Sequence, residues 1–365
     1  MARFKNRYLG LDIGHHMIKA VELEGSTRNN WQVSGVGVAP TPGDSVADGV
    51  IANSELLSGA IRDLIRHNNL TAKHAFCSVS GPAIHFRPLR LPRMKDNQLR
   101  KAVQFKAKEA QTATPIDEMI VEYDIQDVDP SAADLDVLMV AAPRAIVESR
   151  AEAVSEAGLV VESIDLDGFA LMRALIEFSP NPEDMFKTVA IVCMGHTYTE
   201  FNIVTRGTFS FPRSIPIGGS HFNHTLRSSL GLDETAVEEM KHLMDVRPLL
   251  SSDAYTQSSS PEQLLRPAME ELVRELTRSV NYYQSQFAEG TVDAAVDRVL
   301  LCGGGARMLG IQEYMYNRLR LDVEIADPLA AFFQNAASPE MELVSDYSPA
   351  MVCALGLALS GLPNK

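Results

Sequence analysis

Two stretches of the chain share one pattern of apolar residues around a glycine. In residues 8–24, an apolar run leads to a turn at Gly14 and a second apolar run follows. Residues 189–205 repeat this pattern, with Gly195 standing 181 positions after Gly14. Two β-type runs that meet at a glycine are typical of a β-hairpin. We therefore expect two similar hairpins, half a chain apart, in two related lobes.

Further strands and helices are predicted between and after these hairpins. Apolar residues at spacings of three and four predict a long amphipathic helix over residues 264–287. The apolar run 299–302 ends in three glycines and predicts a strand, a turn and then a helix through Leu319. Shorter patterns predict helices at 55–67, 98–108 and 144–157 and strands at 75–79, 122–125 and 136–141. This alternation favours an α/β fold with mixed sheets.

Composition and charge narrow the class of protein. The 365 residues suffice for two or three domains of about 150 residues each. The net charge of −14 argues against a nucleic-acid partner, because surfaces that bind nucleic acid are normally basic. The four cysteines are far apart, as expected for reduced thiols in the cytoplasm. Prolines and glycines interrupt the longest charge-free tract, 347–364, so we expect no membrane-spanning segment.

The first hairpin turn carries side chains that suit phosphate binding. Its sequence is Asp12-x-Gly14-His15-His16-x-x-Lys19. A glycine turn exposes consecutive backbone N–H groups, which form a nest for phosphate oxygens. Lys19 could neutralise a phosphate oxygen, and Asp12 could hold the waters of a Mg²⁺ ion. The same pattern also occurs as ordinary turn chemistry, and the second hairpin makes the phosphate interpretation stronger.

The second hairpin turn and the glycine triplet extend this candidate site. Gly195, His196 and Thr197 form the second turn and would hold phosphate from the opposite side. The run Gly303-Gly304-Gly305-Ala306 lacks bulky side chains, so the planar base of a nucleotide could lie against its backbone. A flexible turn at the start of a helix is the plainer interpretation of that run.

One ion pair could complete the site on the side of the sugar. Glu238 and Lys241 lie three residues apart in a helix that is predicted to begin near Asp233. This spacing places both side chains on one helix face, where they could hold ribose hydroxyls. A solvated ion pair is the commoner role of such residues.

Several longer stretches resemble one family of proteins. They are Gly10-Leu-Asp-Ile-Gly, Leu91-Pro-Arg-Met, Leu99-Arg-Lys-Ala, Val140-Ala-Ala-Pro-Arg, Ile164-Asp-Leu-Asp-Gly-Phe-Ala-Leu, Arg213-Ser-Ile-Pro-Ile-Gly-Gly, Val280-Asn-Tyr-Tyr-Gln-Ser-Gln-Phe, Leu301-Cys-Gly-Gly-Gly-Ala-Arg and Ala354-Leu-Gly-Leu-Ala-Leu. The hairpins and the glycine triplet resemble the actin-like ATPases in general. The stretches at Arg213 and Val280 are more specific, and nearly the whole chain resembles the PilM family of type IV pilus assembly proteins.

The resemblance implies an α/β, two-lobed actin-like fold of the ribonuclease H-like class, close to that of the cell-division protein FtsA. Residues 1–75 and 164–187 would form the first lobe. Residues 188–365 would form the second lobe, with 225–295 as its outer helical part. Residues 76–163 would form an inserted subdomain. In the family, a groove that involves this subdomain receives the cytoplasmic N-terminus of the membrane protein PilN.

The resemblance also implies a function. We expect a cytoplasmic scaffold that binds ATP and Mg²⁺, lies peripherally at the inner membrane and joins a PilN-like protein to the pilus motor and platform. Self-association stays open. Two alternatives remain, a small-molecule kinase with an actin-like fold and a nucleotide-free adaptor that kept only the fold. A kinase needs a base that is positioned for a substrate hydroxyl, and no motif in the sequence marks one.

Three features around the expected γ-phosphate differ from the family pattern. Cys193 stands where the second hairpin usually has aspartate, and a neutral thiol is a poor ligand for Mg²⁺. His15 and His16 replace small hydroxyl residues. Asp167, at the position of the water-orienting catalytic acid, has a shorter side chain than glutamate. We therefore expect ATP binding with a weakened Mg²⁺ site at Asp12, and at most very slow hydrolysis.

The same turns suggest a different ligand, zinc. Cys193 and His196 in one turn would face His15 and His16 in the other, and cysteine and histidine are the usual zinc ligands. Substitutions in a decayed ATP site explain the same residues without a metal.

A basic segment lies within the inserted region. Arg87–Lys108 holds eight lysine or arginine residues against one acid, Asp96. A solvated helix face is the plain interpretation of this charge. The functional interpretation is a face that contacts the anionic inner membrane or an acidic partner.

Overall fold

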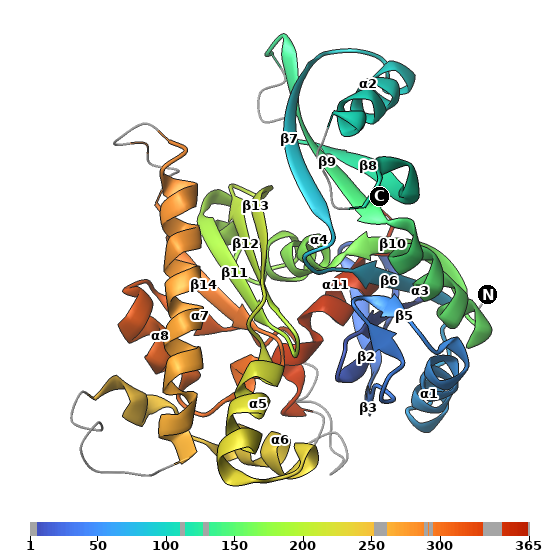
Figure 1. Ribbon diagram of the computed structural model, residues 1–365. Helices are drawn as coiled ribbons and strands as arrows, with labels where there is room; N and C mark the ends of the chain where they lie inside the picture. Colours follow the sequence, from blue (N-terminus) through green and yellow to red (C-terminus); the bar gives the residue numbers. More distant parts are fainter. Residues whose placement is uncertain are drawn as a thin grey trace.

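Two five-stranded sheets form the body of the molecule, and a smaller three-stranded sheet projects from it (Figure 1). The computed structural model describes residues 6–109, 114–126, 131–251, 261–287, 291, 295–330 and 345–363. The first sheet contains β1 (Asn6–Ile13), β2 (Met17–Thr27), β3 (Asn30–Pro40), β6 (His74–Val79) and β10 (Val160–Leu166). The second contains β11 (Thr188–Met194), β12 (Thr199–Thr205), β13 (Thr208–Ile215), β14 (Arg298–Cys302) and β15 (Val323–Ile325).

The two sheets have the same topology, as the repeat in the sequence predicts. In the first, β1, β2 and β3 are antiparallel neighbours, and β6 and β10 follow on the other side of β1 in parallel. In the second, β11, β12 and β13 are antiparallel, and β14 and β15 follow in parallel. Both expected hairpins are confirmed, and the equivalent cross-strand pairs are Asp12 with Lys19 and Cys193 with Glu200.

Helices cover the two sheets on their outer sides. The first sheet is flanked by α1 (Ser54–His67) and α3 (Arg144–Glu156), and the short hairpin of β4 (Val46–Ala47) and β5 (Val50–Ile51) lies against α3. The second lobe carries α5 (Gly219–Leu230), α6 (Glu234–Leu243), α7 (Pro261–Gln284) and α8 (Ile311–Leu319), with α7 alongside β13 (Figure 1). Short helical turns are η2 (Arg173–Glu177), η3 (Pro182–Phe186), η4 (Arg247–Leu250), η7 (Gly304–Arg307) and η8 (Ser348–Met351).

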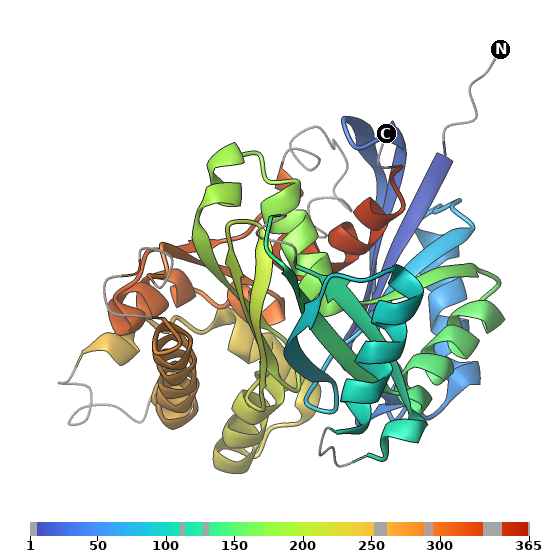
Figure 2. The same ribbon diagram turned by 90° about the horizontal axis from the view of Figure 1, so that it is seen from above.

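A buried helix near the C-terminus joins the two lobes. Figures 1 and 2 show α11 (Val352–Ser360) between the two sheets, where it contacts β1 and α4 (Asp167–Met172). A Cβ atom on Gly10 would lie 1.8 Å from the carbonyl oxygen of Ala354, so glycine permits this close approach. The core around α11 includes residues of both sheets, among them Val21 of β2 and Ile191 of β11. This shared core fixes the two hairpins relative to each other.

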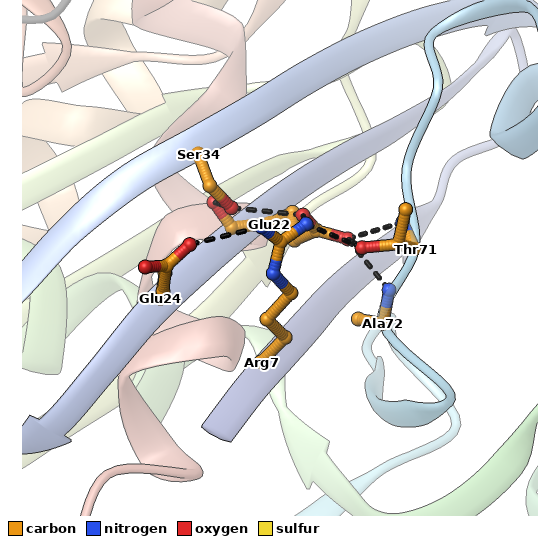
Figure 3. Close-up of polar contacts among 6 residues, drawn as sticks. All are labelled: Arg7, Glu22, Glu24, Ser34, Thr71 and Ala72. Carbon is orange, nitrogen blue, oxygen red and sulfur yellow. Dashed lines mark hydrogen bonds and ion pairs between the residues drawn. The ribbon is translucent and has the colours of Figure 1, made fainter. Parts of the chain in front are cut away.

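A buried carboxylate ties the first sheet to the loop before β6 (Figure 3). Glu22 on β2 is 1% exposed and forms an ion pair with Arg7 of β1 at 3.1 Å. It also accepts hydrogen bonds from the Ser34 hydroxyl at 2.8 Å and from the backbone N–H of Ala72 at 2.6 Å. The backbone N–H of Thr71 is a further donor. A buried carboxylate with this many donors is compensated for the loss of its water.

The small sheet belongs to a unit with a core of its own. It consists of β7 (His85–Pro92), β9 (Asp134–Pro143) and β8 (Met119–Ile125), with β9 in the middle, and is accompanied by α2 (Asp96–Lys108) and η1 (Ile116–Glu118). Leu99 and Val103 of α2 are buried against Leu135 and Met139 of β9. β6 and β10 overlap the two ends of the expected range 76–163 but pair within the first sheet. We therefore propose residues 85–143 as the inserted unit; the other expected bounds stay predictions.

Most predicted elements lie where the pattern of the sequence places them. The long amphipathic helix is confirmed as α7, although it begins at Pro261 and ends at Gln284. After the glycine triplet the chain first makes the short turn η7, and the predicted helix begins only at Ile311. Among the described residues, no helix is both long and apolar enough to cross a membrane.

Candidate functional site

A pocket lies where the two hairpin turns and the glycine triplet meet. It is lined by every candidate site residue that the sequence analysis names except one: Asp12, Gly14, His15, His16, Lys19, Asp167, Gly195, His196, Thr197, Glu238, Lys241, Gly303, Gly304 and Gly305. The exception is Ala306, which is 1% exposed and belongs to the core of the second lobe. The side chain of Ala306 points into that core, so only its backbone could contact a ligand, and the expectation that Ala306 contributes to the site stays a prediction.

The first hairpin contributes a buried ion pair to the lining of the pocket. Lys19 Nζ lies 2.7 Å from Asp12 Oδ2, since the two residues face each other across β1 and β2. Burial raises the pKa of the Asp12 carboxyl, and the positive charge of Lys19 opposes that shift. Burial lowers the pKa of Lys19, but the charge of Asp12 and the hydrogen bond to it outweigh burial and give a net rise. The pair therefore places a cation and an anion side by side under the turn.

The second turn copies the first and touches it across the pocket. The backbone N–H of Gly14 donates to Met17 O at 3.1 Å, and that of Gly195 donates to Tyr198 O, also at 3.1 Å. The rings of His16 and His196 stack with their centroids 5.0 Å apart. Burial lowers the pKa of His196 to about 4, so its imidazole is neutral near neutral pH.

Cys193 is a neutral thiol at the edge of the pocket. Its hydrogen bond with Cys302 and its burial raise its pKa well above the usual value. The thiol therefore does not provide the negative charge that an aspartate would bring to this position. Within the described residues, no group of three or more histidine, cysteine, aspartate or glutamate side chains could hold a metal ion. The zinc interpretation thus lacks a ligand set in this part of the chain.

Two buried ionisable residues in the pocket were not expected from the sequence, Glu200 and Arg150. Glu200 is 9% exposed and accepts a hydrogen bond from the Ser214 hydroxyl at 2.6 Å. Burial raises its pKa to about 8. The repeat could have identified Glu200, because it stands 181 positions after Lys19. No comparable signal marks Arg150, a single arginine in an ordinary helical pattern.

The other end of the pocket is formed by α6 and the glycine triplet. Glu238 accepts hydrogen bonds from Lys241 Nζ at 2.6 Å and from Asn223 Nδ2 at 2.7 Å. Burial opposes the ionisation of Glu238, but its hydrogen-bond partners outweigh burial and hold its pKa well below the usual range. Lys241 is only 3% exposed, so the pair is not the solvated one of the plainer interpretation. Next to the triplet, the Arg307 guanidinium lies 3.9 Å from the centre of the Tyr347 ring.

The inserted unit has a separate hollow between α2 and β8. Its lining includes Ala107 and Lys108 of α2, Ile120 and Val121 of β8, and Arg144 at the start of α3. β8 pairs with β9 on one side and, within the described residues, with no strand on the other. An unpaired strand edge beside a hollow that has both apolar and charged lining residues is suited to an extended peptide.

Ion pairs neutralise part of the basic segment Arg87–Lys108. Arg100 lies 3.0 Å from Glu122, and Lys106 lies 2.9 Å from Glu109. The exposed face of α2 keeps Lys101 and Lys108, with Phe105 between them at 65% exposure. The segment is thus less positive than its composition indicates.

Comparisons with known proteins agree on fold and family. The chain of the "PilM-PilN type IV pilus biogenesis complex" matches with a TM-score of 0.82 at 23% identity, over 98% of both chains. The ethanolamine utilization protein EutJ from Carboxydothermus hydrogenoformans matches with a TM-score of 0.57 at 16% identity, over 97% of this chain and 90% of that one. A MamK double helical filament gives 0.52 at 13% identity, over 98% and 100%.

The expected two-lobed actin-like fold is therefore confirmed. A sequence model of the family "Type IV pilus assembly protein PilM" matches residues 10–362. Since that match spans nearly all of the sequence, the chain belongs to the PilM family of type IV pilus assembly proteins.

Proposed function

We propose that this protein is an ATP-binding scaffold of the type IV pilus assembly platform, and that it works at the cytoplasmic face of the inner membrane. Nucleotide binding is supported above all by the pocket, whose lining includes two glycine turns and a glycine triplet. Family membership supports the pilus part. The similar solved structure is, by its title, a complex of PilM with PilN, which supports a PilN-like partner.

The pocket residues fit a nucleotide with a bound Mg²⁺ ion. Gly304 leaves open space where a side chain would stand, which suits the base. Lys19 and the N–H groups of the two turns suit the phosphates. Mg²⁺ usually keeps several waters and uses one or two carboxylates together with phosphate oxygens, and Asp12 would supply such a carboxylate. The ion would neutralise phosphate charge.

Nucleotide binding rather than turnover is the role that these residues favour. Cys193 is neutral, so only the first turn offers a carboxylate near the expected metal. Preorganised charges around the transferred phosphoryl group provide most of the catalysis in phosphoryl transfer. ATP would then act mainly as a ligand that holds the lobes together and stabilises the fold by mass action.

For the PilN-like partner we propose the hollow between α2 and β8. The N-terminal segment of the partner would pair with the backbone of β8 as an added strand and place apolar side chains in the hollow. The opposite edge strand, β7, contains Pro88 and Pro92, which lack the N–H groups that pairing needs. β8 contains no proline and is the better edge.

The test compares the peptide affinity of two protein variants, each with one substitution in β8. Fluorescence anisotropy would follow a labelled peptide with the N-terminal sequence of the neighbouring PilN-like protein. Ile120→Asp places a charge in the hollow and should abolish binding, while Ile125→Asp changes an exposed residue of β8 outside it. Equal binding by both variants would show that the peptide binds elsewhere. This pair is preferable to deleting 76–163, which would remove parts of β6 and β10 from the first sheet.

Contact with the anionic membrane is a second proposal for the inserted unit. Lys101, Phe105 and Lys108 share the exposed face of α2, and an aromatic residue flanked by lysines is typical of helices that lie at a lipid surface. Sedimentation with anionic vesicles should decrease for the double variant Lys101→Glu and Lys108→Glu. It should also decrease with salt. Native protein that does not sediment with vesicles at low salt would contradict this proposal.

A further inference from the structure

Arg150 is a buried arginine that points from α3 to the first turn. Its side chain reaches the pocket and donates from Nη1 to the carbonyl oxygen of Ile13 at 2.9 Å. The residue is only 6% exposed. Its Nε is buried and has no hydrogen-bond partner among the described residues. One backbone carbonyl is thus the only acceptor that the described residues provide for a group with five N–H donors.

In the part of the chain that the structure describes, no carboxylate pairs with this buried charge. Asp12 is an acid whose pKa the charge of Arg150 lowers, but it forms its ion pair with Lys19, and none of the described carboxylates lies within ion-pair distance of Arg150. Burying a guanidinium without a partner is unfavourable, so such residues are normally paired. An anion in the pocket would supply the missing partner and the missing hydrogen-bond acceptors.

The neighbours of Arg150 indicate which part of a nucleotide lies there. The charge of Arg150 lowers the pKa of His15 in the first turn. The charge of Asp167, the expected water-orienting acid, raises the pKa of the same histidine. The glycine triplet and Glu238, which suit the base and the sugar, are contributed by the second lobe. Arg150 comes from the first lobe, behind the turn of Gly14. In a nucleotide whose base lies against the glycine triplet, the terminal phosphate is the group that would reach the end of the pocket at Arg150.

We propose that Arg150 binds the terminal phosphate of a nucleoside triphosphate and makes the pocket prefer triphosphate to diphosphate. This inference rests on the nucleotide site of the proposed function. Arginine suits the role because its planar fork can donate two hydrogen bonds to phosphate oxygens at once. A diphosphate has no group at this position, so its affinity does not depend on Arg150.

The experiment compares two nucleotides by isothermal titration calorimetry in the presence of Mg²⁺. The probes are ADP and AMPPNP, an ATP analogue whose bond between the β- and γ-phosphates resists hydrolysis. In Arg150→Met, affinity for AMPPNP should fall by about 10- to 100-fold, the usual range for losing hydrogen bonds to a charged group. Affinity for ADP should change by less than about threefold. Arg150→Lys keeps the charge but loses the fork, and should lose AMPPNP affinity to a smaller extent.

A matched control is Arg266→Met. Arg266 is 7% exposed and also donates to a backbone carbonyl, Leu249 O at 2.8 Å, but it lies on α7 and does not line the pocket. It should lower the melting temperature without changing either affinity. Equal losses for ADP and AMPPNP in Arg150→Met would assign Arg150 to support of the turn and overturn the inference, as would no loss at all.

The design separates this inference from the proposed function. If the native protein binds neither nucleotide, the nucleotide site itself is wrong and the role of Arg150 falls with it. If the native protein binds both with equal affinity, the site stands and only the triphosphate preference is refuted. If Arg150→Met does not fold by circular dichroism, Arg150→Lys decides, since a selective loss of AMPPNP affinity supports the inference and an unselective one refutes it.

Discussion

Gly304→Val should block nucleotide binding and leave the fold intact. The middle glycine of the triplet lines the pocket, and a Cβ atom built on it would meet no heavy atom within 4 Å. Its φ is not among the positive values found in the described chain, so a side chain causes no backbone strain. The isopropyl group would occupy the space against which we expect the base to lie.

The structure gives the size and sign of both effects. Replacing a glycine in an unstrained position stabilises a protein by about 0.4–1 kcal/mol, because the unfolded chain loses freedom. Forcing extra methyl groups into a filled site costs about 1–3 kcal/mol. That cost applies only to the bound state and corresponds to a loss of affinity of about 5- to 150-fold. Stability and binding should therefore move in opposite directions.

The two neighbouring glycines provide the contrast. A Cβ atom on Gly305 would lie 2.6 Å from Met194 Cβ. Gly303 has φ of +84° and its Cβ would lie 2.6 Å from Met194 O. Alanine at either position should lower the melting temperature, whereas Gly304→Val should not. Calorimetric titration with ATP and Mg²⁺ measures the affinities, and a Gly304→Val variant that binds ATP like the native protein would refute the assignment of the base to the triplet.

Three further predictions concern charged or ionisable positions. Glu22→Gln should destabilise the protein by about 1–3 kcal/mol in urea titrations, because the amide cannot accept from all the donors around Glu22; an unchanged midpoint would contradict this. Cys193→Asp should raise Mg²⁺-dependent ATP hydrolysis by about 10²–10³, and native protein that hydrolyses ATP as fast would contradict the weakened site. Between pH 4.5 and about 8 the unfolded chain loses a proton that folded Glu200 keeps, so stability falls as the pH rises through this window. Glu200→Gln should flatten this fall in urea titrations at pH 6 and pH 8.5, and equal slopes would contradict it.

Local turn chemistry made the phosphate side of the site predictable. A glycine between two apolar runs determines both the hairpin and the exposed N–H groups, so Asp12, Gly14 and Lys19 follow from sequence alone. The repeat extends this to the second lobe, and following it to the end of the hairpin also gives Glu200. Such residues can be recognised in the sequence because one short segment both forms the turn and, in the function that we propose, binds the ligand.

The features that could not be predicted from the sequence depend on contacts between residues that are far apart along the chain. Arg150 reaches the pocket from a helix more than a hundred residues from the turn it touches, and no periodicity encodes that contact. The narrower bounds that we propose for the inserted unit could not be predicted, because an apolar strand does not reveal which sheet it joins, and β6 pairs with β1. The sequence likewise does not reveal that the Ala306 side chain is buried, because the turn after a glycine triplet cannot be oriented without its neighbours.

The divergence of the two hairpins supports our proposal that the pocket binds ATP without rapid turnover. The first hairpin keeps the pair of Asp12 and Lys19, while the equivalent pair in the second is Cys193 and Glu200. Burial holds the pKa of Glu200 at about 8, so both groups of the second pair are largely uncharged at neutral pH. The second turn would then offer backbone N–H groups and uncharged side chains, and the charges that we expect to face phosphate come from the first lobe. Such an arrangement can hold the ground-state phosphates but gives little additional stabilisation as charge develops during transfer, which is what a structural nucleotide requires.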